Sequence, residues 1–234
     1  MNTKQLLPTI AAALCMAATL SSCSWDDESQ LTYTVTLLAQ VQYEGGPDST
    51  LYLLDDYDQK CWPSNASDLK VKPAGGSRVY VVAQYTQNEV RPGYDIVLYL
   101  TELHVLDVYD VTQADSTTIA NAALDDTKLQ TLSLAWVSSR YLNIDYQFSY
   151  KDKPESHTIA LLCDSATLAV SPLTLRLVRN NQGDAGSLIA RNIVSFDLES
   201  LRGLVPTDSI AINFEVFEEY KSAPILVRLE YKFQ

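Results

Sequence analysis

Strict alternation of apolar and polar residues, with a period of two, recurs along this chain and constrains its fold more than any other feature. It is clearest over 142–150, where Leu, Ile, Tyr, Phe and Tyr alternate with Asn, Asp, Gln and Ser. The segments 31–43, 210–216 and 225–233 follow the same pattern. A period of two predicts strands with one dry and one wet face. Because no segment shows a sustained period of 3.6 residues, the chain is predicted to be all-β.

Shorter apolar runs complete the predicted set of strands: 51–54, 78–85, 94–99, 103–111, 132–138, 158–163, 173–179 and 193–196. Clusters of Gly, Pro, Asn and Asp separate them, as turns require. Short helical turns are expected at 119–124 and 198–201. The segment 112–118 is rich in Thr, Asp and Ser and divides the strands into two groups. We therefore predict two domains, 31–114 and 115–234.

The first 22 residues differ in kind from the rest. An apolar run over 6–20 is too short to cross a membrane, which takes about 20 residues, and residues 1–22 are predicted to be a cleaved signal peptide. Leu20-Ser21-Ser22-Cys23 resembles the lipobox of bacterial lipoproteins, in which the cysteine sulfur is lipidated before cleavage. Cys15 follows the bulky Leu14. Cys23 is therefore the expected lipidation site.

Residues 23–30 form a short acidic tether. It resembles the acidic stretch that exports lipoproteins to the outer face of the outer membrane in Bacteroidetes-type bacteria, and it also fits a plain solvated linker. With a net charge of −12, the chain is not drawn to an anionic leaflet. The lipid is the expected attachment of a surface-exposed protein to the outer membrane.

The acidic balance also argues against a nucleic-acid partner. Between residues 31 and 111 the sequence holds five basic residues and eleven acidic ones, whereas binding to phosphates needs clustered Lys and Arg. Beyond the leader and Cys23, only Cys61 and Cys163 remain. Either one bridge joins these two distant segments or both are buried thiols.

Motifs in both halves resemble those of NigD-like lipoproteins. The first half carries Leu51-Tyr52-Leu53-Leu54-Asp55-Asp56, Trp62-Pro63-Ser64, Gly76-Ser77-Arg78-Val79-Tyr80-Val81 and Tyr94-Asp95-Ile96-Val97-Leu98. The second half carries Leu175-Arg176-Leu177-Val178-Arg179-Asn180-Asn181, Gly183-Asp184 and Val194-Ser195-Phe196-Asp197-Leu198. Asn180 stands where the family often has a histidine. The resemblance implies an N-terminal OB-type barrel, a C-terminal antiparallel, Ig-like β-sandwich, and an immunity or accessory role beside a bacteriocin.

No catalytic signature accompanies these motifs. The sequence lacks G-x-S-x-G, H-E-x-x-H, paired C-x-x-C and P-loop patterns. His104 and His157 are expected in core or turn positions. We expect a non-enzymatic protein without a cofactor. A surface hydrolase acting on glycan or peptide is the third hypothesis, and it requires two facing carboxylates in a cleft.

Two acidic clusters invite a calcium site, since calcium prefers oxygen ligands. Asp55, Asp56 and Asp58 form one cluster, and Asn181, Gly183 and Asp184 form the other. Neither matches the spaced calcium loop, and both fall between predicted strands, where these residue types make turns. No metal is predicted.

The aromatic residues of the first half suggest a binding face. Tyr52, Tyr57 and Trp62 suit stacking on a sugar or a protein hot spot, and they also suit packing within the domain. We therefore expect an interaction module for a protein or glycan ligand. Four serines, Ser49, Ser116, Ser165 and Ser209, follow an aspartate in a pattern that resembles a Bacteroidetes-type O-glycosylation acceptor. Asp-Ser pairs also make turns.

Overall fold

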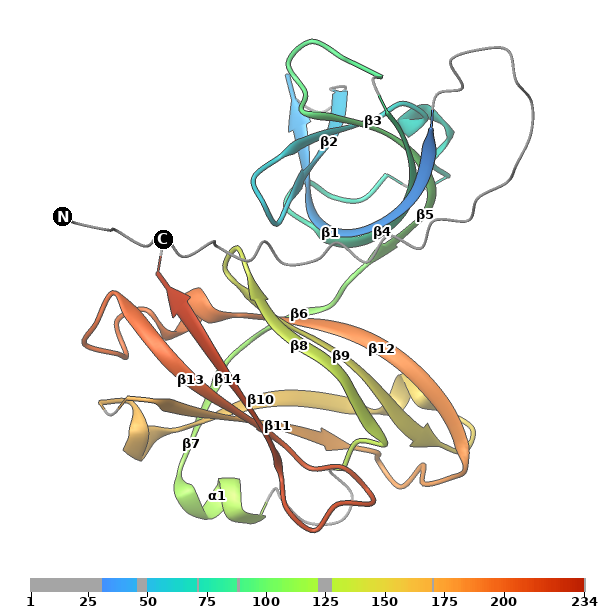
Figure 1. Cartoon of the computed structure of the whole chain (residues 1–234). Helices are drawn as coiled ribbons and strands as arrows, with labels where there is room; N and C mark the ends of the chain where they lie inside the picture. The colour runs from blue at the N-terminus through green and yellow to red at the C-terminus, as the bar shows by residue number, and fades with distance from the viewer. Residues whose placement is uncertain are drawn as a thin grey trace, which may run out of the picture.

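The computed structural model of the protein describes residues 31–45, 50–70, 72–87, 89–121, 128–169 and 171–233. The signal peptide, the tether, Cys23 and Ser49 lie outside the described residues. A barrel is followed by a two-sheet sandwich, with the barrel above the sandwich in Figure 1. The all-β fold class is confirmed. Among the described residues, no helix has the length and apolar character needed to cross a membrane.

Five strands close the barrel in the order β1-β2-β3-β5-β4: β1 (Thr32–Glu44), β2 (Thr50–Asp55), β3 (Lys60–Pro63), β4 (Arg78–Thr86) and β5 (Ile96–Val105). β3 and β5 run parallel, and the other neighbours are antiparallel. A short 3-10 turn, η1 (Ala66–Asp68), follows β3. Ala39, Val41, Leu53 and Val79 are fully buried inside. The result is a five-stranded barrel of OB type.

The N-terminal half of β1 extends beyond its partner β2. It pairs with β4 from Thr32 to Gln40, but with β2 only from Ala39 to Glu44. Within the described part of the chain, residues 32–38 therefore have a strand partner on one side only.

The sandwich has a five-stranded sheet, β14-β13-β11-β10-β7, and a four-stranded sheet, β6-β12-β9-β8. Its strands are β6 (Val108–Asp110), β7 (Thr112–Ala114), β8 (Thr131–Ser138), β9 (Tyr141–Tyr150), β10 (Thr158–Asp164), β11 (Leu173–Asn180), β12 (Leu188–Asp197), β13 (Ser209–Val216) and β14 (Ile225–Lys232). Apolar residues of both sheets meet in one core that includes Ile144, Leu161, Leu175, Phe196 and Phe214.

The family resemblance implies an antiparallel sandwich, but the sheets of this sandwich are mixed. β11 pairs in parallel with β13, β10 with β7, and β12 with β6. Parallel neighbours need a crossover connection. Between β11 and β13 the chain crosses to the other sheet as β12 (Figure 1), so β13 returns beside β11 in the same direction.

Strand pairing also places the division between the domains earlier than 114/115. β6 and β7 lie before that predicted boundary, yet they pair with β12 and β10 of the sandwich. The connection therefore falls at Leu106–Asp107, directly after the barrel strand β5. The polar composition of 112–118 is typical of a linker, but this segment holds β7 and the start of α1 (Ser116–Asn121).

Most predicted strands appear close to their expected positions, but β12 begins five residues before the predicted segment 193–196, and further elements differ. β3 was missed because it has only four residues and ends in a proline. The expected strands 94–99 and 103–111 are replaced by one continuous strand, β5, and the separate short strand β6. The expected helical turn at 119–124 overlaps α1 over 119–121, its other residues lie outside the described residues, and the turn at 198–201 is present as the 3-10 turn η5 (Leu198–Leu201).

The wet face predicted for β9 is wet only in part. Asn143 is fully buried and Asp145 is only 7% exposed. The barrel covers this end of β9, as Figure 1 shows, and its side chains bond to Asn143. Polar alternation therefore marks a surface that faces another domain.

The two cysteines are free thiols in separate cores, one in the barrel and one in the sandwich. Burial raises the pKa of the Cys61 thiol to about 12 and that of Cys163 to about 11. Of the two alternatives, the structure has the buried thiols.

Candidate functional site

Arg78, the first residue of β4, bonds both domains. Its guanidinium is bidentate to the Asp56 carboxylate, with N–O distances of 2.5 and 2.7 Å, and lies 4.3 Å from the centre of the Tyr141 ring. Only 3% of Arg78 is exposed. Asp56 belongs to the turn after β2, whereas Tyr141 opens β9. A buried arginine at the start of a barrel strand therefore contacts the sandwich directly.

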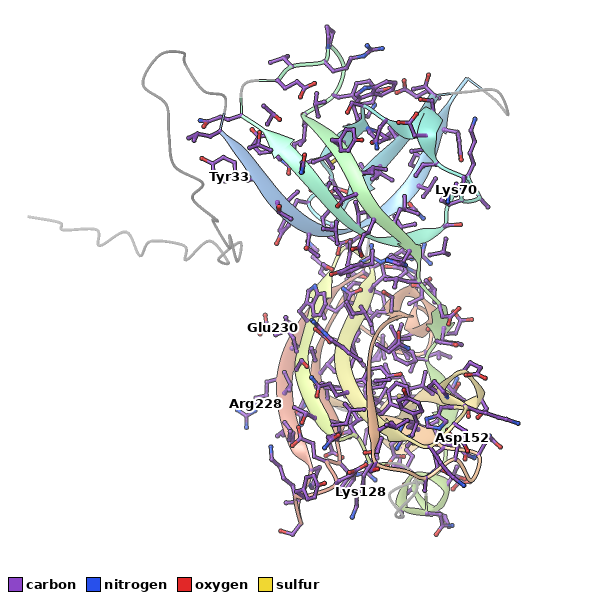
Figure 2. The ribbon with its side chains drawn as sticks, turned by 90° about the vertical axis from the view of Figure 1, so that its right-hand side faces the viewer. Tyr33, Lys70, Lys128, Asp152, Arg228 and Glu230 are labelled. Carbon is purple, nitrogen blue, oxygen red and sulfur yellow. The ribbon has the colours of Figure 1, made fainter. Side chains whose placement is uncertain are left out.

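Three sandwich side chains complete this network. Arg78 donates to Asn143 Oδ1 over 3.1 Å, and the Ser195 hydroxyl donates to the same oxygen over 2.8 Å. The Ser138 hydroxyl donates to Asp56 and accepts a 2.7 Å bond from Asn143. We call Asp56, Arg78, Ser138, Asn143 and Ser195 the seam network. Figure 2 shows side chains of both domains crowding the narrow waist between them.

The seam network joins the domains by bonds that depend on one another. A buried ion pair is stable only if further hydrogen bonds satisfy its polar atoms, and removing one partner leaves an uncompensated charge. The Arg78 and Asp56 side chains are only 2% and 9% exposed, and their remaining bonds come from the sandwich. The charge pair of the barrel is therefore fully satisfied only when the sandwich is in place.

A cavity of about 910 Å³ lies beside the seam network, between the two domains. We call it the seam cavity. The barrel contributes residues of β1, β4, β5 and the β2–β3 turn, and the sandwich contributes residues of β8, β9 and β12. This volume lies within the range of about 300–1,000 Å³ that is typical of ligand sites.

Aromatic and charged side chains share the wall of the seam cavity. The aromatic ones are Tyr33, Tyr57, Tyr80, Tyr85 and Trp136. Four aspartates and a single arginine also line it. Asp145 of β9 is bidentate to that arginine, Arg191 of β12, at 2.8 and 2.5 Å. The cavity therefore offers flat apolar surfaces together with an acidic bias.

Asp55 lies in this wall at the end of β2 and is 9% exposed. Its Oδ1 accepts the backbone N–H groups of Tyr57 and Gln59, over 2.9 and 2.8 Å, and so holds the β2–β3 turn. Burial raises the pKa of this carboxyl, although the two N–H bonds oppose that change.

The predicted aromatic set, Tyr52, Tyr57 and Trp62, is split between two places. Tyr52 and Trp62 both pack against Tyr94, with ring centres 6.1 and 5.0 Å apart. Lys60 lies over the Tyr52 ring and Arg91 over the Trp62 ring. We call these five residues, Tyr52, Lys60, Trp62, Arg91 and Tyr94, the aromatic face. Tyr57 lies apart from them, is 70% exposed and lines the seam cavity.

The second motif region builds a polar chain in the sandwich. Arg179 bonds to His157 Nδ1 over 2.9 Å, and His157 Nε2 lies 3.2 Å from Asp184. Burial acts against the charge of Asp184, but the backbone N–H groups of Asp152 and Lys153 and the His157 ring hold its pKa below its ordinary value. Asn181 accepts the Gly183 N–H. These residues therefore brace the 151–157 and 180–184 turns.

The other predicted candidates have structural surroundings. Asp55 and Asp58 shape the β2–β3 turn, Asp58 with a positive φ of 61°, and Asp56 belongs to the seam network. No group of three potential metal ligands occurs among the described residues. His157 is buried, but the expectation of a core or turn position is wrong for His104, whose side chain is 63% exposed on β5 beside Glu102.

Three of the four glycosylation-like serines are described and all three are exposed: Ser116 in α1, Ser165 in the 3-10 turn η4 (Ser165–Thr167), and Ser209 at the start of β13. The Ser116 hydroxyl donates to Asp164 over 3.0 Å. The predicted candidates did not include Arg78, Asn143, Ser195, Trp136 or Arg191. The sequence offers one signal for these residues: a polar side chain on a regular strand, such as Asn143, can mark a surface that another domain covers.

Comparison with known proteins agrees with this architecture. Residues 112–226 match the family of NigD-like C-terminal beta sandwich domains. A solved "NigD-like immunity protein" from Bacteroides caccae shares 15% identity over 89% of this chain and 99% of its own, with a TM-score of 0.57. A "Putative TOXIN related protein" from Parabacteroides distasonis shares 19% over 85% and 93%, with a TM-score of 0.62.

A "Putative lipoprotein" from Bacteroides fragilis shares 13% identity over 86% of this chain and 99% of its own, with a TM-score of 0.60. At these identities the likeness shows the fold alone. No curated protein matches the chain.

Proposed function

This chain belongs to the NigD-like family through its C-terminal β-sandwich, and on that premise we propose that it is a non-enzymatic binding protein whose ligand site is the seam cavity. The observation that carries the proposal is the hollow of about 910 Å³ between two domains that one buried network holds together. A preformed cavity with aromatic walls and a few polar groups is the usual form of a ligand site. The acidic wall suits a ligand with positive charge.

We also propose that a lipid on Cys23 attaches the protein to the outer membrane and that the protein faces outwards. The support is the lipobox-like Leu20-Ser21-Ser22-Cys23, the acidic tether that follows it, and a structural neighbour named a "Putative lipoprotein". The intact mass of the protein from its native host should exceed that of residues 23–234 by a diacylglyceryl group on the Cys23 thiol and an acyl group on its amine, less the one hydrogen atom that each group replaces. Loss of the protein from intact cells treated with protease tests exposure.

The proposal of a non-enzymatic role rests on how the carboxylates of the cavity are bonded. Asp56 pairs with Arg78, and Asp145 with Arg191. Asp55 holds the β2–β3 turn, and Asp95 accepts the Lys60 N–H over 2.8 Å. Each carboxylate thus has a structural bond, which disfavours the two-carboxylate hydrolase. If the protein hydrolysed a glycan or peptide substrate, and if Asp55→Asn and Asp95→Asn abolished that activity, the hydrolase hypothesis would replace the non-enzymatic one.

Photo-crosslinking tests the cavity as a ligand site. A photoreactive phenylalanine is placed at Trp136, inside the cavity, and at the control position Tyr220, which is 81% exposed on the sandwich. In intact native cells we expect a discrete adduct from position 136 and none from position 220. Equal adducts from both positions, or none from 136, would contradict the proposal.

A second candidate function is protection against a bacteriocin, and a solved neighbour named as an immunity protein favours it. In that function the cavity would bind part of the toxin or shield its receptor. Deletion of the gene should then raise sensitivity to the cognate bacteriocin, and restoring the chain with Cys23 intact should reverse it. Unchanged sensitivity removes this candidate and leaves the binding role.

A further inference from the structure

Among the described residues, the N-terminal half of β1 has a strand partner on one side only, and we call its other side the free edge. Val41 exchanges backbone hydrogen bonds with Ser77 and Gly76, and the Leu31 carbonyl accepts from Gln87, so the odd-numbered residues of β1 point their backbone groups towards β4. The even-numbered residues Thr34 and Thr36 must point theirs the other way. β2 begins to pair only at Ala39. No described residue bonds to the N–H and C=O groups of Thr34 and Thr36.

The seam cavity surrounds this edge. Its wall includes Tyr33, Val35 and Leu37, whose side chains lie on the inner face of β1, and also Thr36 and Leu38 on the outer face. A hollow that touches both faces of one strand must contain the edge between them. Tyr33 marks the start of this edge at the outer margin of the barrel in Figure 2. The other lining residues include those of the β2–β3 turn, the start of β5 and the sandwich strands β8, β9 and β12.

The charges around the edge favour a basic occupant. The carboxylates of Asp56 and Asp145 are neutralised by Arg78 and Arg191. Asp55 and Asp95 accept backbone N–H groups, and neither has an ion-pair partner among the described residues. Two uncompensated negative charges therefore face the cavity. A lysine or arginine side chain would meet complementary charge there, and a carboxylate would meet repulsion.

We propose that the seam cavity binds an extended basic peptide segment that adds as a strand to the free edge of β1 at residues 32–38. This inference rests on the proposed ligand site and names the ligand class. Main-chain bonds to a sheet edge supply affinity, and alternate side chains of the added strand enter the flanking pockets. At about 3.4 Å per residue, residues 32–38 present an edge of about 24 Å, which a decapeptide covers.

Synthetic peptides test the ligand class on the full-length lipoprotein in detergent. The probe is a fluorescent decapeptide of alternating lysine and valine, compared with the glutamate–valine equivalent by fluorescence anisotropy. Two further lysine–valine peptides carry a methyl group on every second backbone nitrogen, one in each phase. We expect at least tenfold weaker binding for the glutamate peptide. The peptide whose methylated nitrogens face β1 should bind at least tenfold more weakly, because methylation removes the main-chain hydrogen bonds and leaves the side chains unchanged.

A proline on the protein side tests the edge itself. Thr36→Pro removes an N–H that faces the cavity and leaves the β1–β4 ladder intact, since proline is tolerated on a free strand edge. Leu226→Pro is the matched control, because Leu226 lies on the edge strand β14 of the sandwich and is 47% exposed. With melting temperatures close to the parent's, Thr36→Pro should weaken the lysine–valine peptide about tenfold and Leu226→Pro should not.

The outcomes separate strand addition from the ligand site. Absence of binding by the lysine–valine peptide overturns the inference, as does equal binding of the glutamate peptide. If Trp136→Ala weakens binding but Thr36→Pro and backbone methylation do not, strand addition is overturned and the cavity remains the binding site. Binding that none of these changes affects would overturn both. A dimer that Thr36→Pro dissociates would assign the edge to a second copy of the chain and would also overturn the inference.

Discussion

The seam cavity and the aromatic face both gather rings and charges on the barrel, but they differ in how completely those groups are satisfied. On the aromatic face, Trp62 and Tyr52 pack against Tyr94, cations cover two of the rings, and the Tyr94 hydroxyl donates to Glu44. At the seam, the buried network lies beside an open cavity and beside a strand edge that no described strand pairs with. Aromatic residues therefore indicate a ligand site only where a cavity lies beside them and nearby polar groups lack hydrogen-bond partners.

The largest expected effect follows from loss of the guanidinium that joins the domains. Arg78→Met should lower the free energy of unfolding by about 3–5 kcal/mol, because it leaves the Asp56 carboxylate buried without a cation. The seam should also lose its coupling, so that barrel and sandwich unfold in two transitions by calorimetry. A cost below about 1 kcal/mol with a single transition would mean that the seam network does not couple the domains.

Ser138→Ala should have a smaller effect on the same network. The hydroxyl donates to Asp56 from the sandwich side and accepts from Asn143, so its loss removes a bond to a charged group, worth about 1.5–3 kcal/mol. Urea unfolding measures the change. Ser139→Ala, at the neighbouring position outside the network, is the control. An equal cost at both positions would assign the effect to the β8–β9 turn rather than to the seam.

On the aromatic face, Trp62→Ala should lower stability by about 1–2 kcal/mol, since it removes a half-buried ring, its contact with Tyr94 and its cation–π contact with Arg91. Binding of the lysine–valine peptide should stay within about twofold of the parent, a free-energy change of about 0.4 kcal/mol. Loss of binding without loss of stability would move the ligand site to this face.

Asp55→Asn should have the smallest effect on stability, with a sign that depends on pH. The raised pKa means that keeping Asp55 charged costs stability above that pKa, and the cost disappears as pH falls towards 3.8. Asparagine keeps the Oδ1 acceptor for both turn N–H groups. At pH 7 the variant should therefore be more stable by less than about 1 kcal/mol, and the gain should shrink on acidification. Destabilisation at every pH would show that the negative charge itself holds the turn.

The sequence predicted those parts of the fold that local pattern controls. Alternation over 142–150 and 210–216 located β9 and β13 almost to the residue. The placement of β6 and β7 in the sandwich could not be read in the same way, because their partners β12 and β10 lie far along the chain. Short polar strands carry little local signal, and their pairing is decided by tertiary contacts.

The candidate site was predictable only in fragments. Asp56, Arg78 and Ser195 each lie in a motif that was recognised in the sequence, but nothing local shows that the three meet. Arg78 and Ser195 are 117 positions apart, and they meet only when both domains fold and dock. Tyr57 was grouped with Tyr52 and Trp62 by proximity in sequence, whereas the β2–β3 turn directs it to the other side.

The most direct test of the account compares crosslinking from the two surfaces in one experiment. The photoreactive residue is placed either at Trp136 in the seam cavity or at Trp62 on the aromatic face, and adducts are quantified from intact native cells. If the seam is the ligand site, position 136 should give a specific adduct that Arg78→Met abolishes, and position 62 should give little or none. A specific adduct from position 62, with none from 136, would contradict the account.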